Sequence, residues 1–121
     1  MRLMQALFTV ALLAGSLLAH ARELAPVERQ KIEYLIASIE TSGDAQFIRN
    51  GTAYSARAAA DHLRLKLRNA GSKVRTAEDF IQYCASTSST TGEPYQIRFP
   101  SGQVMTSEAY LRQKLLEFHE R

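Results

Sequence analysis

Apolar side chains recur at helical spacing in four stretches of this chain, and each stretch predicts a helix. Pro26 suits the first turn of a helix and Gly43 its end. Between them, four apolar residues follow at i, i+3, i+4 and i+7, namely Ile32, Leu35, Ile36 and Ile39. Thr106 or Ser107 is placed to cap the last helix. Its inner face is predicted to carry Leu111, Leu115 and Phe118.

Two further helices are predicted in the middle of the chain. Ser55 is placed to cap the first of them and Gly71 to end it. Its apolar stripe consists of Ala56, Ala59, Ala60, Leu63 and Leu67. Thr76 and Asp79 have the spacing of a capping box, with Asp in place of Glu or Gln. The short helix that they open has one apolar face, formed by Ala77, Phe80, Ile81 and Cys84.

The segments between these helices predict two β-hairpins. The first spans residues 47–54 and turns at Asn50-Gly51, a pair that suits the positive φ angles of a type I′ turn. The second spans residues 95–105 and turns at residues 100–102. The predicted order is α-ββ-α-α-ββ-α. Two antiparallel hairpins packed with about four helices make a single α+β domain.

The same unit occurs twice in that order, as a hairpin followed by a capped amphipathic helix. Gly51 in the first hairpin corresponds to Gly102 in the second, and Ser55 corresponds to Thr106. The side chains between these positions match poorly. The sequence therefore indicates a similarity of architecture and does not establish a repeat.

The N-terminus has the pattern of a secretory signal peptide. A positive start at Arg2 precedes an uncharged run from Ala6 to Leu18, and Ala19-His20-Ala21 offers small residues for cleavage. We expect residues 1–21 to be removed after Ala21, which leaves a periplasmic domain of residues 22–121. The apolar run is shorter than the roughly 20 residues of a membrane-spanning helix, which disfavours an uncleaved anchor. No membrane span is predicted after cleavage.

Charge and cysteine content narrow the possible classes of protein. Cleavage removes Arg2 from 15 basic residues and leaves all 12 acidic residues, so the remaining domain carries about +2. This mild charge does not predict a nucleic-acid partner. The single cysteine, Cys84, cannot form a disulfide within the chain and is too far downstream to carry a lipid anchor.

Several blocks in order resemble one known family: Phe47–Gly51, His62–Lys66, Thr76–Ile81, Ala85-Ser86 and Gly92–Ile97. Together they are similar to the domain-of-unknown-function family of small exported bacterial proteins typified by YfeK. The resemblance extends roughly from residue 32 to residue 116. It implies export in Gram-negative bacteria, and it implies no activity, cofactor or catalytic residue.

The sequence contains no recognisable catalytic or metal-binding motif. A dyad of Cys84 and His62 is conceivable, but Cys84 lies in register with buried positions of its helix, where a thiol is inert. His119 lies between acidic residues near the C-terminus, where a solvated tail is expected. We therefore predict no catalytic residue, no metal ligand and no cofactor.

The second predicted helix carries a candidate binding surface. Arg57, Arg64 and Arg68 gather on one flank, with Asp61 between them. Such a row could bind an anionic envelope component or an acidic periplasmic protein. Alternatively, Asp61 and the arginines form an ordinary ion-paired surface.

The Ser/Thr-rich loop at residues 86–92 is a second candidate. Its hydroxyl groups, among them Ser86 and Ser88, precede Tyr95 and could hydrogen-bond a sugar or a peptide. The alternative is a flexible connector.

Leu65 is apolar yet points away from the stripe of the second helix. Ala58 and His62 are its neighbours on that side. Either the first hairpin packs over this side of the helix, which we expect, or Leu65 belongs to a partner surface.

Three classes of function fit these observations. The preferred hypothesis is a noncatalytic periplasmic module that binds an envelope component or a protein. The alternatives are a small periplasmic hydrolase or thiol enzyme that uses His62, and a structural or oligomerising domain with exposed apolar residues such as Leu65 and Leu116.

Overall fold

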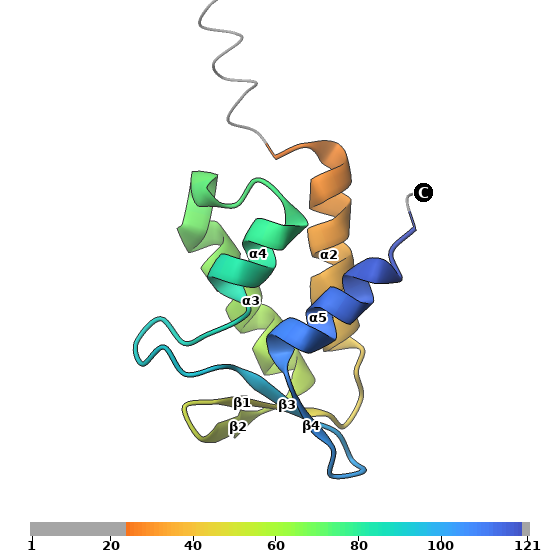
Figure 1. The fold of residues 1–121 in the computed structure, drawn as a ribbon, viewed down its shortest axis with the longest axis vertical. Coiled ribbons are helices and arrows are strands. Elements are labelled where there is room, and N and C mark those ends of the chain that lie inside the picture. Colours follow the sequence, from red (N-terminus) through yellow and green to blue (C-terminus); the bar gives the residue numbers. More distant parts are fainter. Residues whose placement is uncertain (1–23, 120–121) are drawn as a thin grey trace, which may run out of the picture.

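The computed structural model describes residues 24–119 and confirms the predicted α+β domain (Figure 1). The predicted signal peptide lies outside the described residues. The elements are α2 (Pro26–Glu40), β1 (Gln46–Arg49), β2 (Thr52–Tyr54), α3 (Ala56–Ala70), the 3₁₀ turn η1 (Gly71–Lys73), α4 (Ala77–Cys84), β3 (Gln96–Arg98), β4 (Val104–Thr106) and α5 (Ser107–Leu116). None of the helices between residues 24 and 119 is long and apolar enough to cross a membrane.

The two hairpins join into a single four-stranded antiparallel sheet of order β2-β1-β3-β4. The first strands of the hairpins pair with each other, with Phe47 opposite Ile97. The helices lie together on one side of this sheet (Figure 1). Because strand side chains alternate between faces, Phe47 and Ile97 are buried toward the helices while Gln96 and Arg98 are exposed.

The hydrophobic core forms where the four helices meet over the sheet. The apolar positions predicted for α2 are all buried, as are those of α4, including Phe80 and Cys84. In the predicted stripe of α3, Ala56, Ala60 and Leu63 are buried, and Ala59 and Leu67 are partly buried and pack against the core. Phe118 lies just beyond the end of α5, where its ring packs edge-on against the ring of Tyr34, with the ring centres 5.5 Å apart.

Three helices begin at the predicted hydroxyl caps. The side chains of Ser55, Thr76 and Thr106 accept hydrogen bonds from backbone N–H groups three residues later, at 3.2, 3.0 and 3.1 Å. The carboxylate of Asp79 accepts from the backbone N–H of Arg75 at 3.0 Å, one residue before the position that a capping box uses.

The first hairpin turns as predicted, because Asn50 and Gly51 have φ angles of 50° and 78°. Asn50 also holds the Ser/Thr-rich loop in place. Its amide donates to Ser88 Oγ at 3.1 Å, and its carbonyl oxygen accepts from Thr91 Oγ1 at 2.6 Å. This residue therefore sets both the turn and the position of the loop.

One expectation about packing is wrong in part. The first hairpin does lie over the side of α3 that carries Ala58 and His62, since residues of both elements line one cavity. It does not cover Leu65, whose side chain is 45% exposed. Arg49, at the end of β1, contacts His62, which lies one turn before Leu65 in α3.

Two substitutions of Asn50 separate its turn role from its loop role. Asn50→Gly removes the side-chain hydrogen bonds but keeps the positive φ, so we expect unfolding to require about 1 kcal/mol less free energy. Asn50→Ala adds a left-handed backbone penalty and should cost about 2 kcal/mol in total. Urea denaturation measures both variants. Equal stability of Asn50→Gly and the parent chain would contradict a stabilising role for the loop contacts.

Candidate functional site

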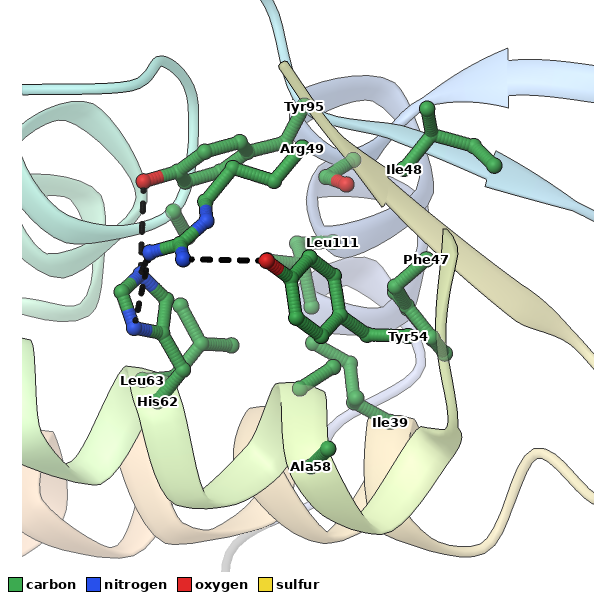
Figure 2. Close-up of a pocket in the computed structure, with 13 residues that line it drawn as sticks. Ile39, Phe47, Ile48, Arg49, Tyr54, Ala58, His62, Leu63, Tyr95 and Leu111 are labelled. Carbon is green, nitrogen blue, oxygen red and sulfur yellow. Dashed lines mark hydrogen bonds between the residues drawn. The ribbon is translucent and has the colours of Figure 1, made fainter. Parts of the chain in front are cut away.

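A cavity of about 180 Å³ lies between the first hairpin and α3. Its apolar wall comes from several elements: Ile39 of α2, Phe47 and Ile48 of β1, Ala58, Ala59 and Leu63 of α3, Ala85, and Leu111 of α5. The space exists because α3 presents the short side chains of Ala58 and Ala59 to the hairpin. Arg49, Tyr54, His62, Tyr95 and Ser107 supply the polar part of the lining. Figure 2 shows the side chains of Arg49, Tyr54, His62 and Tyr95 turned toward one another above the apolar floor.

Arg49 is the charged residue that lines this cavity. It lies two positions after Phe47 in β1, so the strand directs both side chains to the helical side of the sheet. Its guanidinium Nη2 donates to the Tyr54 hydroxyl at 3.2 Å, and its Cζ lies 5.1 Å from the centre of the Tyr54 ring. Within residues 24–119, no carboxylate forms an ion pair with Arg49.

His62 projects from α3 toward the same guanidinium. Arg49 Nη1 lies 3.2 Å from Nε2 of His62 and 3.4 Å from Nδ1. Because a guanidinium can only donate, the ring nitrogen facing it accepts, which requires a neutral imidazole. Burial lowers the pKa of His62, and the positive charges of Arg49 and Lys66 lower it further.

Tyr95 connects this cluster to the chain that precedes β3. Its hydroxyl accepts from Lys66 Nζ at 3.0 Å and lies 3.5 Å from His62 Nε2. Lys66 also donates to the carbonyl oxygen of Thr87 at 3.3 Å, so α3 and the Ser/Thr-rich loop are held together. Every buried side-chain nitrogen and oxygen in the described part of the chain has a hydrogen-bond partner.

This arrangement can bind an anion attached to an apolar group. The guanidinium of Arg49 has five N–H donors, and its closest contacts to His62 and Tyr54 engage two of them. The Tyr54 hydroxyl, which accepts from Arg49, keeps its own proton to donate. An acidic group at the guanidinium would therefore meet spare donors, while its apolar part would contact the cavity floor.

Cys84 does not belong to this cavity. The side chain is 1% exposed, and burial raises the pKa of its thiol, as expected from its position in α4. No hydrogen bond joins Cys84 to His62 in the described region, so these residues do not form a dyad there. Across residues 24–119, no three His, Cys, Asp or Glu side chains converge in a way that could hold a metal ion.

The three arginines predicted as a row on α3 differ in their surroundings. Arg64 pairs with Asp61 at 3.0 Å and also with Glu40 of α2, which matches the alternative of an ion-paired surface at this position. Arg57 and Arg68 are exposed, and neither forms an ion pair within the described residues. The row lies outside the lining of the cavity.

The hydroxyl residues predicted as a second site are mostly engaged within the protein. Ser86 Oγ donates to the carbonyl oxygen of Ile81 at 2.6 Å. Ser88 is buried and contacts Asn50 and Thr90. Of the predicted binding residues, the structure brings only Tyr95 into the cavity.

Sequence reasoning missed Arg49 as a site residue and considered His62 only as part of a catalytic dyad. One signal was available: strand alternation places Arg49 on the same face as the buried Phe47. A positive charge on the inward face of a strand is unusual and indicates a specific partner. The partner itself, His62 in a helix, depends on how far the hairpin lies above α3.

Comparisons with known proteins identify similar chains but no activity. Residues 26–119 match the family of unknown function DUF5329. The chain is 43% identical over 68 residues to the uncharacterized protein YfeK of Salmonella typhimurium, an alignment that covers 56% of this chain. It spans 57% of the Salmonella protein, so this chain matches little more than half the length of that relative. No solved structure matches this chain.

Burial of Cys84 makes its reactivity a test of the thiol-enzyme alternative. Because the thiol is covered and burial raises its pKa, a disulfide reagent should label the native protein slowly and the urea-unfolded protein fast. The released chromophore measures both rates. Fast labelling of the native protein would instead support a reactive cysteine.

The lowered pKa of His62 should make the stability of the fold depend on pH. The unfolded chain, with a histidine pKa near 6.5, binds a proton that the folded chain excludes. The contribution of neutral His62 to the free energy of unfolding is therefore complete above pH 6.5, and it is lost as the pH falls toward the lower pKa of the folded state. Urea denaturation between pH 5 and 8 should show a smaller pH dependence for His62→Gln than for the parent chain. Identical pH profiles would contradict the lowered pKa.

Proposed function

The chain belongs to the family of unknown function DUF5329, so family membership assigns no activity to it. From the geometry of the cavity, we propose that the protein is a noncatalytic module that binds a small apolar molecule bearing an acidic group. The binding site is the cavity between the first hairpin and α3. We propose further that the module works in the periplasm after removal of residues 1–21, in keeping with the signal-peptide pattern of its N-terminus.

One observation supports this proposal above the others. The guanidinium of Arg49 lies at an apolar cavity, and no carboxylate of residues 24–119 pairs with it. Charged side chains that leave bulk water are normally paired. An acidic ligand would supply the missing countercharge, and the planar donor fork of arginine suits a carboxylate.

The size of the cavity limits the apolar part of the ligand. An engineered cavity of about 150 Å³ in another protein binds benzene, and the cavity here measures about 180 Å³. One aromatic ring or a short aliphatic chain therefore fits. An acidic envelope component that carries such an apolar group could place it in the cavity. The proposed ligand is therefore one kind of the envelope component that the sequence suggests.

Binding of three matched probes tests the proposal. Phenylacetate, 2-phenylethanol and phenethylamine share one aromatic ring and differ in charge. Charge-assisted hydrogen bonds contribute about 1.5–3 kcal/mol, so phenylacetate should bind at least about tenfold more tightly than the neutral alcohol. Phenethylamine should bind most weakly. Amide chemical shifts measured during titration give the affinities and should locate binding at residues 47–63 and Tyr95.

Three variants separate the cavity from the arginine row. Arg49→Gln should weaken phenylacetate binding about tenfold, since it removes the charge-assisted contact. Arg57→Gln removes the same charge from an exposed position of α3 and should leave binding unchanged. Ala59→Leu fills the cavity and should block all three probes. Absence of saturable binding, or loss of binding in Arg57→Gln but not in Arg49→Gln, would refute the proposed site.

A further inference from the structure

The polar groups that lie around His62 are cations and hydroxyl groups. Arg49 approaches from β1, Lys66 lies one turn further along α3, and Tyr95 approaches from the segment before β3. Tyr54 of β2 reaches the same cluster through Arg49. Asp61, its neighbour in sequence, is turned to Arg64. A protonated His62 would therefore stand beside two positive charges without a carboxylate.

Resting on the function proposed above, we propose that the ligand is a monocarboxylate that binds beside Arg49 and His62 and draws one proton from solvent onto His62. The cavity thus takes up an anion and a proton together. Binding is expected to strengthen as the solution becomes more acidic.

The hydrogen-bond directions favour this coupled uptake. Without an anion, Arg49 Nη1 lies 3.2 Å from Nε2 and 3.4 Å from Nδ1 of His62, and a neutral ring can offer one of these nitrogens as the acceptor. A protonated ring has no acceptor and would oppose the Arg49 donor. A carboxylate beside the two side chains accepts from Arg49 and from the protonated His62. The anion converts a repulsion between Arg49 and a protonated His62 into two charge-assisted hydrogen bonds.

The small number of donors in the site favours a ligand with one carboxylate. Of the residues that line the cavity, only Arg49 carries a permanent positive charge. Lys66 does not line the cavity, and its ammonium group donates to Tyr95 and to the carbonyl oxygen of Thr87. Arg49 neutralises the charge of a single carboxylate, and His62, once protonated, donates a second charge-assisted hydrogen bond to it. A phosphate group would bring more acceptor oxygens than a carboxylate into an apolar cavity that offers few further donors.

The sign of the pH dependence follows from the two states of His62. Burial and its cationic neighbours lower the pKa of His62 in the free protein, whereas a bound carboxylate raises it. Between these two pKa values, binding takes up a proton. The affinity should therefore increase as the pH falls through this interval, by at most about tenfold per pH unit for one proton.

Titration of the protein with phenylacetate between pH 5.5 and 8 tests this inference. The probe stays ionised over this range because carboxylic acids of this kind titrate near pH 4.3. We expect at least a fivefold gain in affinity from pH 8 to pH 5.5. The imidazole resonances of His62 should also move to the protonated position at a higher pH when phenylacetate is saturating.

Two histidine variants make the result specific. His62→Gln should bind phenylacetate with an affinity that does not change with pH, while His119→Gln, altered outside the cavity, should keep the pH dependence of the parent chain. Saturable binding with equal affinity at all pH values would overturn the proton coupling and leave the proposed function intact. Binding of inorganic phosphate more tightly than phenylacetate would overturn the monocarboxylate class. Absence of phenylacetate binding would overturn both proposals.

Discussion

The antiparallel pairing of β1 with β3 is the contact on which the rest of this structure depends. Each hairpin alone is a marginal structure that needs a third strand or a helix to be stable. The pairing of Phe47 with Ile97 joins two hairpins from opposite ends of the domain and gives the helices one apolar surface to cover. The helix that follows each hairpin then lies on the same side of the sheet (Figure 1).

The same pairing explains why a charged side chain reaches the interior. Once Phe47 is directed toward the helices, the alternation of the strand carries Arg49 to that side as well. The neighbouring α3 offers small residues beside His62, so the guanidinium has both space and an acceptor. The cavity and its polar cluster thus arise from the strand register that also builds the core.

Local sequence signals were sufficient for the individual elements of this fold. The caps at Ser55, Thr76 and Thr106 and the turn at Asn50-Gly51 are specified by residues only a few positions apart, and all of them form as predicted. The joining of the hairpins was not predicted, because the partners β1 and β3 are some fifty residues apart and their strands are short. The site was missed for the same reason, since Arg49 and His62 meet only after that sheet has formed and settled over α3.

The buried cysteine gives the stability of this fold a chemical consequence. Cys84 is buried and belongs to the hydrophobic core. Each complete unfolding event exposes the thiol to oxidants, and a sulfinic acid or a mixed disulfide cannot return to an apolar interior. Since oxidation to a sulfinic acid is irreversible, the unfolding rate limits how long the protein survives in oxidising surroundings.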